Sequence, residues 1–393
     1  MKWETVNLGE LCSVITKGTT PSNIGASFTD KGIKYIRSEM LTSAKYICGE
    51  LLYISQQTHE RLKRSQLRAG DILFSMAGVY LGKTAILRPE DVPANTNQAV
   101  ALIRVDTDKA NNEFVYYFLN VPEVIKISNT IQSQSAQPNI NLKQIGQLKI
   151  QLPPLCSQNR IVEILSAYDD LIETNQRQIK LLEEASQRLY KEWFVDLRFP
   201  GHENVPVVDG VPEGWNRRRL VDIAEVQYGY AFDGHLFNDK KQGMPIVRIR
   251  NIPEGVSGDY TTESADEQYL VFNGDIVVGM DGEFHINTWS GDTSYLVQRT
   301  CRIRPQSVFM NGWLLQAIVE PIKYFEKTVV GATVAHLGKK HIDTINLLVG
   351  PERLNEPFQK MFDRRQVLLN QNRKLIEARD RLLPKLMSGE IAV

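Results

Sequence analysis

An internal repeat of about 200 residues constrains the fold of this chain more than any other feature of its sequence. Residues 3–11 align with residues 215–223, residues 69–78 with 273–282, and residues 140–154 with 337–351. The matching segments keep the same order, while the loops between them differ in length. Because a repeat of this size is a whole folding unit, the 393 residues are predicted to hold two copies of one domain.

The first part of each copy consists of short strand-like runs. They are rich in Val, Ile and Leu and are bounded by Gly, Pro, Asn or Asp, which is typical of strands. They cover residues 33–37, 71–75, 99–105, 246–250, 275–279 and 296–303. Short helices are predicted at residues 58–64, 112–120 and 311–328. Each copy is therefore predicted to begin with a mixed α/β domain.

Each copy ends in a long helical stretch. Residues 157–196 contain no Gly or Pro and fit a heptad pattern, and residues 355–387 carry paired apolar side chains every seven residues. About 40 residues of helix span about 60 Å, which a small domain cannot cover. Each helix is therefore predicted to pack antiparallel against the other. The predicted seam residues are Ile161, Leu165, Ile172, Asn175, Ile179, Leu182, Phe362, Leu369, Asn372, Ile376 and Leu383.

Two asparagines, Asn175 and Asn372, interrupt this apolar seam. A buried polar residue in a seam sets the register of the two helices at some cost in stability. The alternative is that each asparagine lies half-exposed at the edge of the seam. The sequence leaves both interpretations open.

A stretch dense in Pro and Gly at residues 199–214 is predicted to link the two copies. The predicted organisation is a first domain at 1–154, a first long spacer helix at 155–198, the linker, a second domain at 215–351, and a second long spacer helix with a C-terminal tail at 352–393. The predicted fold class is α+β, with two mixed α/β domains in tandem repeat, separated by two long antiparallel coiled-coil helices.

The net charge of the chain is zero, with 46 basic and 46 acidic side chains. This balance argues against a protein that depends on non-specific attraction to phosphates, which needs a positive face. The charge is unevenly distributed, because residues 1–152 carry 17 basic and 13 acidic side chains and residues 201–350 carry 14 and 19. A basic face on the first copy is therefore compatible with the sequence.

No catalytic or metal-binding pattern is found in the sequence. Residues 77–84 fit a relaxed phosphate-loop pattern, but a short apolar run ending at Pro89 follows instead of a helix. We interpret this segment as a glycine turn that presents Lys83 and Thr84 outward, with a nucleotide hydrolase as a less favoured alternative. His336 and His341 lie five residues apart with no acidic partner, so a metal site is a weak hypothesis.

Amide, hydroxyl and basic side chains cluster between the predicted strands. Such side chains can read bases and bind phosphates, although for any single residue a hydrated loop is the simpler explanation. The candidate DNA-binding residues are Arg37, Lys83, Thr84, Asn97, Gln98, Gln132, Gln134, Gln137, Asn139 and Lys143 in the first copy, and Arg217, Arg248, Arg250, Arg299, Lys339 and Lys340 in the second.

The chain shows no sign of export or of a membrane span. Its first residues lack the apolar run of a signal peptide, and nowhere do 18 uncharged apolar residues occur together. The four cysteines are far apart and form no C-x-x-C pair. We expect a cytoplasmic protein with reduced thiols.

Several of these features together resemble one known family. Each copy holds a Gly-Asp-Ile strand, at residues 70–72 and 274–276. Each copy ends in one or two prolines, at 153–154 and at 351, followed by a long helix. Residues 158–161 read Gln-Asn-Arg-Ile at the start of the first helix, and the chain end contains Leu-Leu-Pro-Lys-Leu-Met-Ser-Gly-Glu-Ile at 382–391. Over essentially its whole length the chain resembles the specificity subunit of a type I restriction-modification system.

This resemblance implies a function in DNA recognition rather than catalysis. It implies two target-recognition domains, each reading one half of a bipartite, asymmetric DNA site. The helices would act as a spacer and as the docking surface for two methyltransferase subunits, and through them for endonuclease and translocase subunits. The chain itself is expected to bind no cofactor, whereas S-adenosylmethionine, ATP and Mg are expected on the partner subunits. The alternative function is a coiled-coil protein-interaction scaffold without DNA binding.

Overall fold

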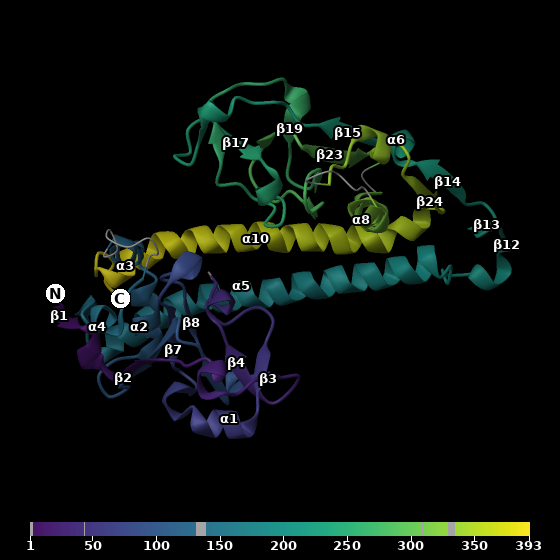
Figure 1. Ribbon diagram of the computed structural model, residues 1–393. Coiled ribbons are helices and arrows are strands. Elements are labelled where there is room, and N and C mark those ends of the chain that lie inside the picture. The colour runs from purple at the N-terminus through teal and green to yellow at the C-terminus, as the bar shows by residue number, and fades with distance from the viewer. Residues whose placement is uncertain (1–2, 43, 131–138, 308–309, 329–334) are drawn as a thin grey trace. The chain divides into compact units, whose positions relative to one another are not determined.

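The computed structural model describes residues 3–42, 44–130, 139–307, 310–328 and 335–393, and its helices and strands are shown in Figure 1. The chain divides into two compact units. The first comprises Met1–Glu173 and Leu375–Val393, and the second comprises Thr174–Lys374. Each unit therefore holds one α/β domain together with part of both long helices.

The first unit contains two main sheets. The four-stranded sheet has the order β2 (Cys12–Lys17), β10 (Val100–Val105), β7 (Ile72–Ser75) and β8 (Thr84–Ile86). The five-stranded sheet has the order β3 (Phe28–Thr29), β5 (Leu52–Ile54), β4 (Ile33–Ile36), β9 (Ala94–Thr96) and β6 (Gln66–Leu67). A ladder pairs β1 (Glu4–Asn7) with β11 (Lys149–Leu152). The shorter helices are α1 (Gln56–Arg61), α2 (Asn112–Leu119), α3 (Pro122–Thr130) and α4 (Leu142–Gly146).

The second unit repeats this arrangement strand for strand. Its four-stranded sheet has the order β15 (Ala224–Tyr228), β23 (Thr300–Pro305), β20 (Ile276–Gly279) and β21 (Ile286–Thr288). Its five-stranded sheet has the order β16 (Phe237–Asn238), β18 (Tyr260–Thr261), β17 (Met244–Val247), β22 (Ser294–Leu296) and β19 (Leu270–Val271). A ladder pairs β14 (Asn216–Arg219) with β24 (Asn346–Val349), and the shorter helices are α6 (Leu220–Ile223), α7 (Asn311–Ala317), α8 (Val319–Thr328) and α9 (Lys339–Ile342).

The shared topology confirms the predicted duplication. In both five-stranded sheets the central pair is parallel, β4 with β9 in the first unit and β17 with β22 in the second. The linker contains a small hairpin of β12 (Val207–Val208) and β13 (Val211–Pro212).

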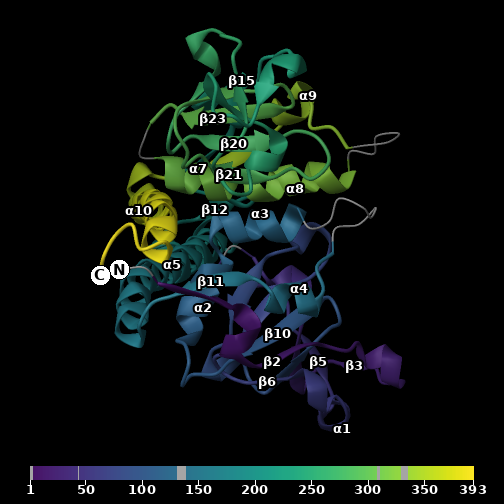
Figure 2. The same ribbon diagram turned by 90° about the vertical axis from the view of Figure 1, so that its left-hand side faces the viewer.

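The strand β7 is buried on both faces, which explains its continuous apolar sequence. Ile72 and Phe74 pack with Phe114 of α2 in one core cluster. Leu73 packs with Leu102 in a second cluster, because successive side chains of a strand point to opposite faces. In the second unit α7 and α8 lie beside the sheet that contains β20 (Figure 2), and their apolar side chains share a cluster with those of β20.

Several predicted elements differ from the observed ones. The single strand predicted at residues 296–303 is divided between β22 and β23, because the chain turns at Arg299, where φ is +66°. The single helix predicted at residues 311–328 is divided into α7 and α8 at Ile318. The elements predicted at residues 33–37, 71–75 and 99–105 correspond to β4, β7 and β10.

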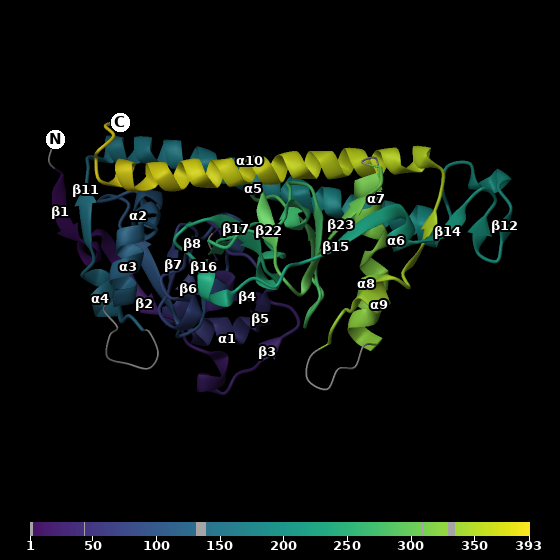
Figure 3. The same ribbon diagram turned by 90° about the horizontal axis from the view of Figure 1, so that it is seen from above.

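The two long helices are α5 (Leu155–Tyr190), of 36 residues, and α10 (Glu356–Met387), of 32 residues. A π-helical turn at Lys191–Val195 ends the first of them. Within the second unit the helices run antiparallel, because Asn175 pairs with Asn372 whereas Glu183 pairs with Arg365. Figure 3 shows the two helices from above.

Most predicted seam residues are turned inward. Ile161, Leu165, Ile172, Ile179, Phe362 and Leu383 are buried, and Leu182 and Leu369 are partly buried. Ile376 is 37% exposed, so its assignment to the seam is wrong. Along this turn of α10 the preceding residue, Leu375, is partly buried instead. In the first unit Ile161, Leu165 and Leu383 belong to the core of the α/β domain, which covers the ends of both helices.

The two seam asparagines are buried rather than half-exposed. Asn175 is 3% exposed and Asn372 is 6% exposed. The Asn175 side-chain amide donates a hydrogen bond of 2.9 Å to the Asn372 Oδ1 and a longer one of 3.2 Å to Gln371. This pairing favours the first interpretation, because Asn175 and Asn372 can form this hydrogen bond in only one register of the helices.

Breaking the asparagine pair on one side is expected to cost more than removing both partners. In Asn175→Leu the buried Asn372 amide loses a hydrogen bond, and the free energy of unfolding is expected to fall by about 1–3 kcal/mol. The double variant Asn175→Leu/Asn372→Leu has an apolar seam and should regain this stability. Chemical unfolding of the three proteins measures the difference. A double variant that is no more stable than the single one would contradict a paired role.

Candidate nucleic-acid interface

Three exposed lysines occupy matching short helices of the two units. Lys143 lies in α4, and Lys339 and Lys340 begin α9. Each helix buries one isoleucine, Ile145 or Ile342, against its own domain, so the lysines point to solvent. None of the three ammonium groups has an ion-pair partner within the described part of the chain. Unpaired ammonium groups of this kind are available to phosphates.

Arg217 is a fourth available cation. It lies on β14, where all four residues are exposed. Its guanidinium has no side-chain partner among the residues that the structure describes. It therefore remains a candidate contact to the DNA backbone.

The loop between β9 and β10 carries two of the predicted amides. Asn97 Oδ1 accepts a hydrogen bond of 3.2 Å from the Ala99 N–H. Gln98 is exposed and accepts a hydrogen bond from the Thr20 hydroxyl. One bond is thus made within the loop, and the other joins the loop to the segment that follows β2.

In each unit a glycine allows another segment to pass very close to the start of this loop, which lies between β9 and β10 in the first unit and between β22 and β23 in the second. The backbone of Gly18 passes so close to β9 that a Cβ there would lie 1.9 Å from the carbonyl oxygen of Thr96. At the matching Gly229 a Cβ would lie 2.0 Å from the carbonyl oxygen of Val297. Both distances are far below van der Waals contact, so only glycine allows the two segments to approach this closely.

The Gly-Asp-Ile strands have a structural explanation. Asp71 forms two hydrogen bonds of 2.7 Å with Arg104, from Nε and from Nη2. Asp275 forms the same double contact with Arg304, at 2.6 and 2.5 Å. Each aspartate also accepts the backbone N–H three residues before it. These arginine clamps join the start of β7 to β10 and the start of β20 to β23, so Arg104 and Arg304 are partly buried and bonded within their own domains.

Thr84 was predicted to contact DNA, and this prediction is wrong. Its side chain is only 1% exposed, and its hydroxyl accepts a hydrogen bond of 2.7 Å from the Asn120 amide. The segment that follows Gly82 is strand β8 rather than a helix, so the phosphate-loop alternative is wrong as well. Lys83 is partly buried and lines a cavity of 270 Å³ together with Asp169 and Arg379.

Several predicted arginines have partners on the protein surface. Arg37 forms an ion pair of 2.9 Å with Glu39, and Arg248 lies over the ring of Phe237. Arg250 pairs with Asp259 through both carboxylate oxygens. Burial would raise the pKa of Asp259, but the hydrogen bonds from Arg250 and Asn251 outweigh burial and hold its pKa below the ordinary value. These contacts reduce the charge that the arginines can offer to DNA.

The remaining predicted residues divide into two groups. Asn139 is exposed and forms an isolated antiparallel bridge with Ala77. Gln132, Gln134 and Gln137 lie outside the described residues.

Two groups of polar residues were missed from the sequence. The first is Asp281, which accepts hydrogen bonds from Arg299 and from His336, so His336 does have an acidic partner. The second is Arg365 of α10, which is 9% exposed and bonds to Glu183 of α5 and to Thr288 of β21. Both groups join residues that are distant in the sequence, and no local pattern marks them.

No group of three or more potential metal-ligating side chains is found among the described residues. Within the same residues no helix is long and apolar enough to cross a membrane. The exposed positive charges and the loop amides together fit a binding surface.

Comparison with known proteins identifies the family. The family described as "Type I restriction modification DNA specificity domain" matches residues 1–184 and 212–356, which contain the two α/β domains. The chain belongs to this family. As a member of the type I specificity family it is a non-catalytic subunit, in agreement with the resemblance noted in the sequence.

Relatives in the type I specificity family match either the whole chain or part of it. The MjaIX specificity subunit of Methanocaldococcus jannaschii is 26% identical, and the match covers 100% of this chain and 94% of that protein. The EcoBI specificity subunit of Escherichia coli is 28% identical over 38% of this chain and 32% of its own. The solved S subunit of a type I system from M. genitalium has the same fold, with a TM-score of 0.58, 14% identity, and coverage of 98% and 95%.

Proposed function

We propose that this chain reads a bipartite, asymmetric DNA site, one half with each α/β domain. The observation that carries the proposal is the repetition of one backbone framework with different side chains on it. Lys143 on α4 corresponds to the lysines of α9, whereas the residues around them differ between the units. Two domains that share a fold but present different side chains would recognise two different half-sites.

In this proposal α5 and α10 set the distance between the half-sites. The 36 residues of α5 are continuous, and the helix belongs partly to each unit. A helix of this length spans about 54 Å, which corresponds to about 16 base pairs at 3.4 Å each. The gap between the half-sites would therefore depend on helix length rather than on the recognition residues.

The helices would also bind two methyltransferase subunits, and through them the endonuclease and translocase subunits. Exposed apolar side chains on α5 and α10 support a protein partner, since their burial would favour association. They are Leu171, Leu181, Val367 and Ile376, which are 39%, 59%, 55% and 37% exposed. The chain itself would bind no cofactor, and S-adenosylmethionine, ATP and Mg would be bound by the partner subunits.

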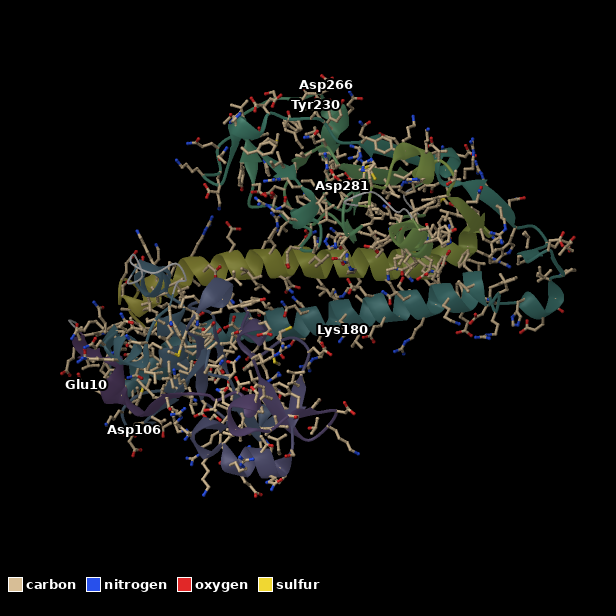
Figure 4. All side chains as sticks on the ribbon, in the orientation of Figure 1. Glu10, Asp106, Lys180, Tyr230, Asp266 and Asp281 are labelled. Atoms are coloured by element: carbon tan, nitrogen blue, oxygen red, sulfur yellow. The ribbon has the colours of Figure 1, made fainter. Side chains whose placement is uncertain are left out.

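Lengthening both helices by one heptad tests the spacer function. One insertion follows Lys180, which is exposed on α5 (Figure 4). The other follows Val367 on α10, because the pairs 175–372 and 183–365 flank this height. A heptad preserves the seam and adds about 10.5 Å, or about three base pairs. Site selection with the methyltransferase present should yield the same half-sites with a gap about three base pairs longer.

A control variant and two contradicting outcomes complete the test. A seven-residue insertion after Gly210, in the turn between β12 and β13, lengthens the chain without lengthening a helix and should leave the gap unchanged. An unchanged gap in the heptad variant would refute the spacer function. A wild-type complex that selects no DNA sequence would favour the alternative function, a coiled-coil scaffold without DNA binding.

A further inference from the structure

The end of β7 forms a small backbone framework in the first unit. The N–H of Met76 donates to the carbonyl oxygen of Ala99 at 2.8 Å, and the carbonyl oxygen of Met76 accepts the N–H of Ile140 at 3.0 Å. The next residue, Ala77, forms a bridge with Asn139. Three segments that are distant in the sequence are thus joined at one point of the domain surface.

The end of β20 forms the same framework in the second unit. The N–H of Met280 donates to the carbonyl oxygen of Arg299 at 2.9 Å, and the carbonyl oxygen of Met280 accepts the N–H of Leu337 at 2.7 Å. Asp281 forms a bridge with His336. Figure 4 labels Asp281 on the second unit.

The backbone hydrogen bonds therefore align three positions of the two domains. Ala77, Ala99 and Asn139 of the first unit correspond to Asp281, Arg299 and His336 of the second. The backbone hydrogen bonds at these positions are the same in both units, although φ is positive at Arg299 and not at Ala99. All three side chains differ. Such positions are suited to determine what each domain recognises, because their side chains can change without disturbing the fold.

In the second unit the three side chains form one hydrogen-bonded group. Asp281 is 12% exposed at its side chain, and its two oxygens accept separately from Arg299 Nη1 and His336 Nδ1. Burial would raise the pKa of Asp281, but the hydrogen bonds from His336 and Arg299 outweigh burial and keep the pKa below the ordinary value. The carboxylate is held from both sides and orients the guanidinium.

Arg299 extends from this group into solvent. Its side chain is 68% exposed, and only its Nη1 has a hydrogen-bond partner among the described residues. A guanidinium has five N–H donors in a rigid plane, so most of them remain available. The backbone of Arg299 has a φ of +66°, an uncommon conformation for a side chain other than glycine. Strained residues of this kind persist mainly where their placement serves a function.

We propose that Arg299 is a specificity-determining residue that reads a guanine in the half-site of the second domain, with Asp281 and His336 as positioning residues. This inference rests on the proposed function. The guanine O6 and N7 accept two parallel hydrogen bonds from an arginine, the most common specific contact in the major groove. The first domain has alanines at two of the three positions and therefore lacks this reader, which agrees with an asymmetric site.

Site selection and binding with Arg299→Ala test the proposal, using the full chain in complex with its methyltransferase. The preference for G·C at one position of one half-site is expected to weaken by roughly 5- to 150-fold. The other half-site and the gap should be unchanged. Asp281→Asn, which retains the arginine but weakens its support, should reduce the same preference to a smaller extent. Arg198→Ala is the matched control, because Arg198 is 57% exposed and also pairs with an aspartate, Asp196, just before the linker.

Three other outcomes would overturn the inference. If Arg299 instead contacts a phosphate, Arg299→Ala weakens binding to all sequences equally and leaves the selected bases unchanged. The slope of the logarithm of the binding constant against the logarithm of the salt concentration then falls in magnitude by about one. If Arg198→Ala relaxes the same base position, the effect is not specific to Arg299. In both cases the wild-type complex still selects a bipartite site, and the proposed function stands. A wild-type complex that selects no bipartite site refutes the proposed function and this inference together.

Discussion

Replacing Asp71 or Asp275 by Asn is expected to lower the free energy of unfolding by roughly 3–5 kcal/mol, because it removes one partner of a buried ion pair. The Asp71 side chain is 2% exposed and that of Arg104 is 20% exposed. The values for Asp275 and Arg304 are 10% and 29%. Asn preserves the shape of the side chain but leaves the guanidinium without a compensating charge in a poorly solvated position.

Chemical unfolding of the full chain measures this effect. Asp30→Asn makes the same change of charge at an exposed residue of the first unit and serves as the control. Surface substitutions of this type usually stay within about 0.5 kcal/mol of the wild type. If Asp71→Asn is as stable as Asp30→Asn, the Gly-Asp-Ile strand owes its presence in both copies to something other than the arginine clamp.

Replacing Gly18 or Gly229 by Ala is expected to cost about 3 kcal/mol, at the upper end of the usual range for overpacking. The atom that a Cβ would meet is a backbone carbonyl oxygen, at 1.9 Å for Gly18 and at 2.0 Å for Gly229. A backbone cannot move aside as a flexible side chain can. The substitution must therefore separate β9 or β22 from the segment that crosses it.

Gly258→Ala provides the control for these variants. A Cβ at Gly258 would meet nothing within 4 Å, and its backbone does not require a positive φ. We expect Gly258→Ala to unfold at the wild-type denaturant concentration and Gly229→Ala at a clearly lower one. Equal midpoints for the two variants would mean that the chain relaxes around Gly229 without cost.

The comparison of prediction and structure is clearest for the long helices. Their existence, their antiparallel pairing and most of the seam follow from periodicity, which is a local property of the sequence. Asn175 and Asn372 could be identified as seam residues, but only the structure shows that they bond to each other. Ile376 was assigned inward and lies outward, because paired apolar residues leave the choice between neighbours to the packing.

The candidate interface was predicted less well, and the reason is electrostatic. The sequence identifies a basic residue but not its partner, which usually comes from another segment. Arg250 has an acidic partner, Asp259, whereas Lys143, Lys339 and Lys340 have none among the described residues. The domain bounds predicted from the sequence stay predictions, since the compact units divide both long helices between them.

The duplication, the α+β fold class, the two long helices and the resemblance to the specificity family could all be predicted from the order of residues, because repeats and periodicities are local patterns. Which charges pair within the protein and which are available to DNA depends on the tertiary structure. It turned Thr84 inward, joined Asp71 to Arg104, and brought Asp281 to Arg299 and His336. These contacts depend on distances between segments far apart in sequence, and such distances exist only once the chain has folded.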